Sequence, residues 1–124
     1  VEDLEKLVNE KTVAILYNFP SNPTGATVSM EQRDQLVDFA VRNDLWIISD
    51  EVYDRIIYNE VHVSFLGAGH DKLFLINSFS KTFAMTGWRI GYIISPDEDA
   101  MVQINKMQYY VTACSNDAMQ YAVL

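Results

Sequence analysis

The chain is 124 residues long, so it forms one domain or part of one, and its 49% hydrophobic and 21% charged residues are typical of a globular protein. A formal net charge of −8 argues against nucleic acid or an anionic membrane as a partner, because both attract basic surfaces. One cysteine, Cys114, excludes an internal disulfide and, with no signal peptide or long apolar run, predicts a cytoplasmic protein without a membrane span.

The first half of the chain alternates helix-like and strand-like segments, which predicts an α/β fold with a largely parallel sheet. Residues 2–10 have the pattern of the end of an amphipathic helix, and residues 12–17 that of a buried strand, followed by a turn-rich loop at 18–25. Ser29 and Gln32 have capping-box spacing, which predicts a helix that runs to about Arg42. Its apolar face comprises Leu36, Val37, Phe39, Ala40 and Val41.

Three more short apolar runs, at 45–49, 73–78 and 90–95, predict three further buried strands. Pro96 and the three acidic residues after it predict the start of another helix, because acidic side chains stabilise the positive end of a helix. The methionine and tyrosine content of this helix indicates core packing. Its expected buried stripe comprises Met101, Ile104, Met107 or Gln108, and Val111.

Polar residues gather just beyond the carboxyl ends of three successive predicted strands. Asn22 follows the first strand, Asp50 ends the second and Ser78 ends the third. In an open α/β sheet, ligands bind in the crevice outside these ends, so residues far apart in the chain can meet in one pocket. Lys81 and Arg89 follow shortly after the third strand.

Each candidate also has an ordinary structural explanation. The segment 22–25, Asn-Pro-Thr-Gly, is a good turn sequence whatever its function, and Asp50 can equally cap a helix or a turn. Tyr53 can be a packing residue, Lys81 a solvated lysine and Arg89 an ion-pair donor. Their combination carries the functional prediction.

Four segments follow one another in the chain: Asn-Pro-Thr-Gly at 22–25, Asp-Glu-Val-Tyr at 50–53, Ser-Phe-Ser-Lys-Thr at 78–82 and Gly-Trp-Arg-Ile-Gly-Tyr at 87–92. In this order and approximate spacing they resemble the large domain of class I/II aminotransferases of the aspartate aminotransferase family. The resemblance implies a three-layer αβα fold with a mostly parallel sheet. It also implies that residues 1–124 are part of a domain that binds pyridoxal 5′-phosphate (PLP), without the family's small domain and N-terminal segment.

The resemblance assigns roles that PLP chemistry requires. Lys81 matches the lysine that holds PLP as a Schiff base and then moves a proton as general acid and base. Asp50 matches the anion that keeps the pyridine nitrogen protonated, which PLP needs in order to act as an electron sink. Asn22 and Tyr53 match the two donors to the cofactor's phenolic oxygen.

Ser78 and Arg89 match the family's phosphate contacts, and a hydroxyl and a planar guanidinium suit a phosphate in an otherwise acidic chain. The sequence has no Walker or G-x-G-x-x-G motif, which argues against a dinucleotide or a nucleoside triphosphate at these positions. No metal site is expected, because His62 and His70 have no carboxylate or cysteine at ligand spacing.

The implied function is transamination of the aspartate or aromatic type, in which an amino acid gives up its amino group and a 2-oxo acid such as 2-oxoglutarate receives it. The family also implies a homodimer. Two alternatives stay open: a PLP-dependent C–S lyase of the same fold, and the aminotransferase-like sensor domain of a transcription regulator. Because the family completes its site with further segments and a second subunit, we expect these 124 residues alone to be inactive.

Overall fold

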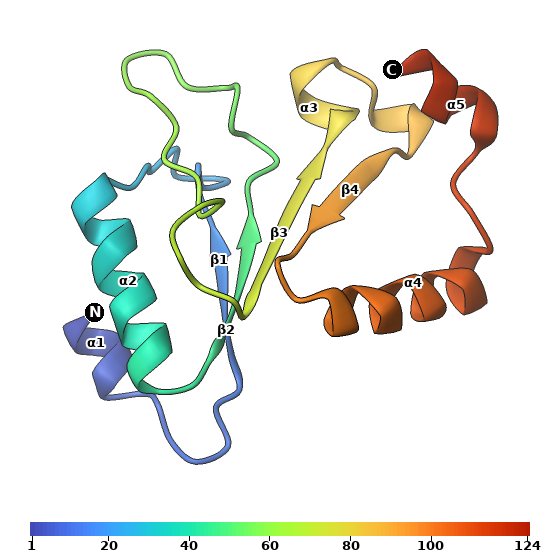
Figure 1. The fold of residues 1–124 in the computed structure, drawn as a ribbon. Helices are drawn as coiled ribbons and strands as arrows, with labels where there is room; N and C mark the ends of the chain where they lie inside the picture. The colour runs from blue at the N-terminus through green and yellow to red at the C-terminus, as the bar shows by residue number, and fades with distance from the viewer.

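The structure is a computed structural model that describes all of residues 1–124. Its elements are, in chain order (Figure 1), α1 (Glu2–Glu5), β1 (Ala14–Asn18), α2 (Met30–Arg42), β2 (Trp46–Asp50), β3 (Leu73–Ser78), α3 (Phe79–Thr82), the 3₁₀ turn η1 (Thr86–Trp88), β4 (Gly91–Ile94), α4 (Glu98–Thr112) and α5 (Asp117–Ala122). The four predicted strands and both longer helices are present. The N-terminal helix is shorter than predicted, and α3, η1 and α5 were not predicted.

The four strands form one sheet in the order β1-β2-β3-β4. The first three strands are parallel, whereas β4 is antiparallel to β3, so the predicted α/β fold with a mostly parallel sheet is confirmed. The register pairs Asn18 with Asp50, and Asp50 with Ile76. The carboxyl ends of β1, β2 and β3 therefore open onto the same edge of the sheet, at the top of Figure 1.

The core lies between α2 and one face of the sheet. The capping box at the start of α2 is confirmed: Gln32 N donates to Ser29 Oγ at 3.1 Å, and Ser29 N donates to Gln32 Oε1 at 2.9 Å. The buried apolar side chains of this core are Leu36, Val37, Phe39, Ala40, Leu45, Ile47, Phe65 and Leu73. Val41 is exposed, contrary to the prediction, because at about 100° per residue it lies outside the arc of the helix that the four buried residues Leu36, Val37, Phe39 and Ala40 occupy.

The predicted buried stripe of α4 is wrong. No residue of α4 is buried, and the side chains of Met107, Gln108 and Val111 are exposed. Of the predicted stripe, Met101 and Ile104 alone are half-buried; they line a pocket with Ile76 and Ser78 of β3. The first turns of α4 thus lie at the face of the sheet opposite α2, which gives the predicted three layers. The second half of α4 extends away from the sheet, where none of the 124 residues covers it (Figure 1).

The two outer strands are also less buried than predicted. Every residue of β4 is exposed, and Leu16 at the centre of β1 is 74% exposed. Both strands form edges of this sheet, so each has a strand on one side only. The central strands β2 and β3 alternate between buried and half-buried residues, as expected for a sheet covered well on one face. None of the helices has both the length and the apolar composition to cross a membrane.

Candidate active site

The site is built at the edge where the parallel strands end. Asn18, the last residue of β1, connects the end of β2 with the loop after β1. Its Nδ2 donates to the Asp50 carbonyl oxygen at 3.4 Å, and its Oδ1 accepts from Asn22 N at 3.4 Å. The loop that carries Asn22 is closed by a hydrogen bond from Gly25 N to the Ser21 carbonyl at 2.8 Å. Asn18 therefore holds the loop after β1 against the end of β2, a role that was not predicted from the sequence.

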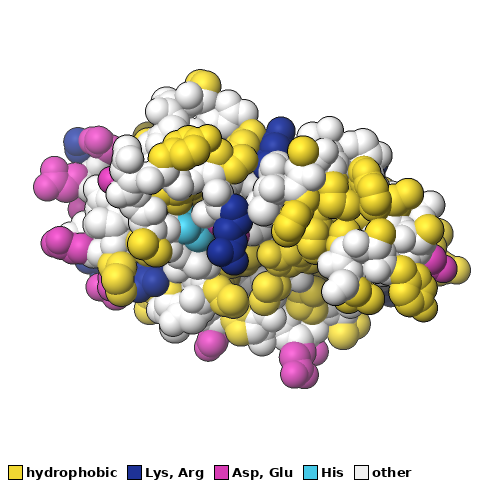
Figure 2. Space-filling model, turned by 90° about the horizontal axis from the view of Figure 1, so that it is seen from above, with side chains coloured by type: hydrophobic (Ala, Val, Ile, Leu, Met, Phe, Trp, Pro, Cys, Tyr) yellow, Lys and Arg dark blue, Asp and Glu magenta, His cyan; other side chains and the backbone are white.

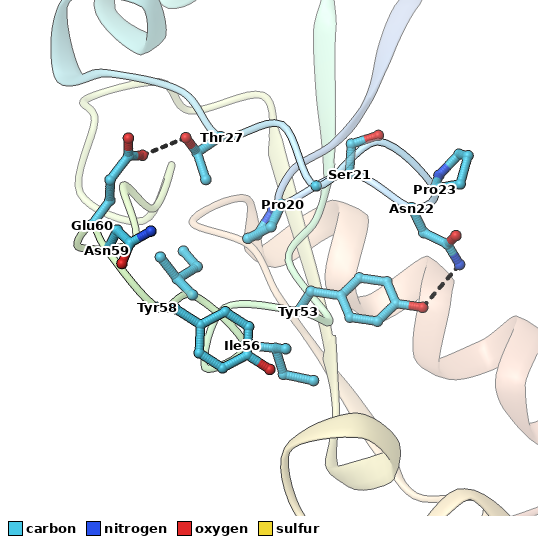
Figure 3. A pocket seen from close by; sticks show the side chains of 12 residues that line it. Pro20, Ser21, Asn22, Pro23, Thr27, Tyr53, Ile56, Tyr58, Asn59 and Glu60 are labelled. Atoms are coloured by element: carbon cyan, nitrogen blue, oxygen red, sulfur yellow. Dashed lines mark hydrogen bonds between the residues drawn. The ribbon is translucent and has the colours of Figure 1, made fainter.

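Asn22 and Tyr53 lie together although 31 positions separate them in the chain. The Asn22 amide nitrogen donates to the Tyr53 hydroxyl at 3.0 Å (Figure 3). Both side chains line a pocket of about 550 Å³ between the loop after β1 and the segment after β2. Ile56, Ile57 and Tyr58 add apolar surface to its wall. The two predicted phenolic-oxygen donors are thus close enough to act on one ligand atom.

Lys81 lies near the same tyrosine. It lies in α3, directly after β3, and its Nζ stands 5.6 Å from the centroid of the Tyr53 ring. Ser78 begins this helix: its Oγ accepts from Ser80 N at 2.9 Å, which fixes the turn that carries Lys81. The hydroxyl proton of Ser78 stays available for an anion, because the cap uses Ser78 only as an acceptor.

Asp50 ends β2 with its carboxylate half-buried. Its Oδ1 accepts from Val52 N at 3.2 Å, whereas Oδ2 has no hydrogen-bond partner in the chain. One carboxylate oxygen is therefore available to a cationic group. Asp50 and Lys81 do not line the pocket beside Tyr53 or the pocket beside Ser78. Asp50 is placed relative to the other candidates by its strand pairing with Asn18, and Lys81 by its position near the Tyr53 ring.

Ser78 and Arg89 line a second pocket, of about 460 Å³, between β3, β4 and α4. Ser80 lines this pocket too and was not predicted from the sequence. The Ser-x-Ser spacing before Lys81 could have indicated Ser80. Arg89 has a left-handed backbone with φ 57°, an uncommon conformation for a residue other than glycine. One guanidinium nitrogen donates to the Thr86 carbonyl at 2.9 Å, which leaves further N–H groups for an anion.

Gly91 lets β4 come close to the end of β3. It is paired with Ser78, and a Cβ at this position would stand 2.8 Å from the Asn77 carbonyl oxygen. Real Cβ atoms do not approach an oxygen that closely, so only glycine fits without a shift of the strands. The close pairing places Arg89, two residues before Gly91, beside Ser78.

The electrostatics of this edge suit an anionic ligand. In a view toward the carboxyl ends of β1, β2 and β3, basic side chains lie near the middle of the visible face (Figure 2). The hydroxyls of Ser78 and Ser80 and the guanidinium of Arg89, which line the second pocket, are donors that hold phosphate oxygens.

The donor set fits PLP. The cofactor needs an anion for its ring nitrogen, donors for its phenolic oxygen, an amine for its aldehyde and a phosphate site. The edge offers an amide and a phenol already hydrogen-bonded to each other, a carboxylate with one free oxygen, a primary amine, and a pocket with two serines and an arginine. In the same order these are Asn22, Tyr53, Asp50, Lys81, Ser78, Ser80 and Arg89.

Comparison with known proteins gives a consistent result. A family model described as aminotransferase class I and II matches residues 1–124. The chain is 43% identical over 126 residues to an aspartate aminotransferase of Thermotoga maritima, covering 100% of this chain and 33% of that protein. It is 41% identical over 125 residues to aromatic-amino-acid aminotransferase 2 of Thermococcus litoralis, covering 98% of this chain and 32% of that protein.

The fold of the chain also matches that of solved aminotransferase structures. The crystal structure of an aspartate aminotransferase from Thermotoga maritima superposes with a TM-score of 0.93 and 42% identity, over 99% of this chain and 33% of that one. The chain spans about a third of the length of the relatives it matches. The family match covers every segment that carries a candidate residue, and the chain belongs to the aminotransferase class I and II family.

Proposed function

We propose that the protein containing this chain is a PLP-dependent aminotransferase that moves an amino group from an amino acid to a 2-oxo acid. The observation that carries the proposal is the position of the Lys81 amine, 5.6 Å from the ring of Tyr53, whose hydroxyl accepts the hydrogen bond from Asn22. A primary amine and two polar groups for a phenolic oxygen thus meet at the carboxyl ends of parallel strands, where this class of sheet binds ligands.

When bound, PLP supplies an aldehyde that exchanges amines and a ring that accepts electrons from the substrate's α-carbon. Lys81 would hold the cofactor covalently and move a proton between substrate and cofactor as a general acid and base. Asp50 would place a negative charge beside the ring nitrogen and keep it protonated. Asn22 and Tyr53 would stabilise the negative charge of the phenolic oxygen by donating hydrogen bonds.

The second pocket would hold the cofactor's phosphate. Ser78, Ser80 and Arg89 line this pocket, and together they offer two hydroxyls and a planar guanidinium. The pairing of Gly91 with Ser78 supports this role, because it brings the arginine-bearing turn and the serine-bearing turn to one place.

We further propose an amino acid substrate of the aspartate or aromatic type. The names of the relatives support this: the Thermotoga maritima protein is an aspartate aminotransferase and the Thermococcus litoralis protein an aromatic-amino-acid aminotransferase. A homodimer and a cytoplasmic location also remain proposals. The apolar side chains that α4 and α5 expose support a homodimer; they include Met107, Tyr110, Val111 and Tyr121.

The test uses the full-length protein with PLP. We expect an imine absorbance band near the visible edge that borohydride fixes irreversibly in the wild type, and no such band in Lys81→Ala. Lys106→Ala, which removes an exposed lysine from α4, serves as the matched control and should keep the band. An unchanged adduct in Lys81→Ala would refute the lysine's role.

A product assay separates the proposed reaction from that of a lyase of the same fold. With glutamate as the amino donor, transamination forms a 2-oxo acid and transfers nitrogen to the acceptor. Release of ammonia and a thiol from a sulfur-containing amino acid, without any acceptor, would instead indicate a C–S lyase and contradict the proposed transfer.

A further inference from the structure

A second carboxylate, that of Glu51, follows Asp50 directly and is almost completely buried, with a side chain 3% exposed. Its Oε1 accepts hydrogen bonds from Ser49 Oγ at 3.0 Å and from Phe65 N at 2.9 Å. Its Oε2 lies 2.6 Å from Nε2 of His62, whose side chain is 16% exposed. None of these residues is a candidate cofactor ligand, so the proposed function leaves this buried cluster unexplained.

Glu51 connects the end of β2 to a distant part of the chain. The segment between β2 and β3 contains no helix or strand, and the contacts of Glu51 with His62 and Phe65 fasten that segment to the strand end. The backbone of Glu51 is fixed as well: its N–H donates to the Ile76 carbonyl at 2.9 Å, and its carbonyl accepts from Asp54 N at 2.9 Å. Glu51 is therefore held through both its side chain and its main chain.

The buried carboxylate remains charged. Burial by itself raises the pKa of Glu51, but the hydrogen bonds from His62 and from the Phe65 amide outweigh it and hold the pKa below its ordinary value. A buried charge is costly unless it is paired, and an apolar side chain of similar size often fills such a space at no loss of stability. A carboxylate with three partners fixes one geometry of the turn, which an apolar side chain does not do.

We propose that Glu51 and His62 form a positioning pair for the cofactor site. Asp50 lies one position before Glu51 and Tyr53 two positions after it, so a turn clamped at Glu51 fixes the direction of both side chains. Glu51 is anchored in the protein interior, whereas Asp50, the last residue of β2, is half-buried and points to the face of the sheet opposite the buried Ser49. This inference rests on the proposed function, since it concerns where Asp50 and Tyr53 stand relative to PLP.

The test measures the pH midpoint of the imine absorbance in the full-length holoenzyme. A hydrogen bond donated to the phenolic oxygen takes up part of its negative charge, so that this oxygen holds the imine proton less strongly. When Tyr53 is displaced, the midpoint should rise. We expect a rise of about one pH unit in Glu51→Ala and a smaller rise in His62→Ala, which leaves Glu51 two of its partners.

Glu51→Gln is the conservative variant, and its imine absorbance should keep the pH midpoint of the wild type. Its amide oxygen still accepts from Ser49 and Phe65, and its amide nitrogen can donate to a neutral His62. Glu10→Ala, which removes an exposed carboxylate between α1 and β1, is the matched control and should leave the midpoint unchanged.

Unchanged midpoints in Glu51→Ala and His62→Ala, accompanied only by lower melting temperatures, would overturn the positioning pair while leaving the proposed function intact. If Glu51→Ala does not fold, His62→Ala decides: a rise supports the pair and an unchanged midpoint overturns it. A wild-type holoenzyme without any imine band contradicts the proposed function itself, and this inference with it.

Discussion

Tyr53 is the side chain at which two other candidate residues meet, since its hydroxyl accepts from Asn22 and the Lys81 amine lies over its ring. Tyr53→Phe keeps the ring and removes only the hydroxyl. One hydrogen bond contributes about 1 kcal/mol, so we expect kcat/KM to fall by about fivefold. Steady-state kinetics check this, with Tyr58→Phe as control, because Tyr58 is on the rim of the same pocket and 90% exposed. Equal losses in both variants would contradict a specific role of the Tyr53 hydroxyl.

Asp50 has a different expected signature, because it acts on the electronics of the cofactor rather than on its attachment. In Asp50→Ala the ring nitrogen loses the anion that keeps it protonated, whereas Lys81 still holds the cofactor. We expect the imine band to persist and kcat to fall roughly a hundredfold or more, the scale for loss of one electrostatic group. Asp38→Ala, at an exposed position of α2, is the control. Turnover near that of the wild type would count against the electron-sink argument.

The positions of individual residues at the strand ends were predictable from the sequence where the residues belong to a compact motif. Asn22, Asp50, Lys81 and Arg89 each fall in a segment whose order along the chain places it at a strand end. Asn18 was not predictable, because its role depends on two hydrogen bonds across the sheet edge. The partners of Glu51 were equally hidden, since they lie up to 14 positions away in a segment without regular structure.

The pairing of β3 with β4 is the structural basis of the proposed phosphate site, and Gly91 makes it possible. In Gly91→Ala the new Cβ would meet the Asn77 carbonyl at 2.8 Å, so the strands must separate or shift. Overpacking of this kind typically costs about 1–3 kcal/mol. We expect a lower melting temperature and weaker PLP binding, because Ser78 and Arg89 move apart.

Gly87→Ala is the matched control for this change, because a Cβ at Gly87 would have no atom within 4 Å. Equilibrium binding of PLP and thermal unfolding of the full-length protein measure both effects. Equal PLP affinity in the two variants would contradict the idea that close strand pairing forms the phosphate site.

The helices and strands whose buried faces are covered by other residues of this chain were predicted well. The helix α2 has its cap, its apolar face and its sheet among the 124 residues, and its start and end were predicted correctly. The burial of β1, β4 and α4 was predicted wrongly for one physical reason. An apolar pattern shows that a face can be covered, but not which segment covers it, and none of these residues covers Leu16, Met107 or Val111.

The pH dependence of folding stability offers a test of the buried charge that needs no cofactor. Because the pKa of Glu51 is held below its ordinary value of 4.5, the folded protein binds this proton less readily than the unfolded chain does. The stabilisation is therefore complete above about pH 4.5 and is lost as the pH falls through the folded-state pKa. Glu51→Gln has no charge to lose, so urea unfolding of the apo protein should show the wild type more stable at pH 7, with the difference shrinking toward pH 3. A difference that stays constant with pH would mean that the carboxylate acts through its shape, and that its charge does not stabilise the fold.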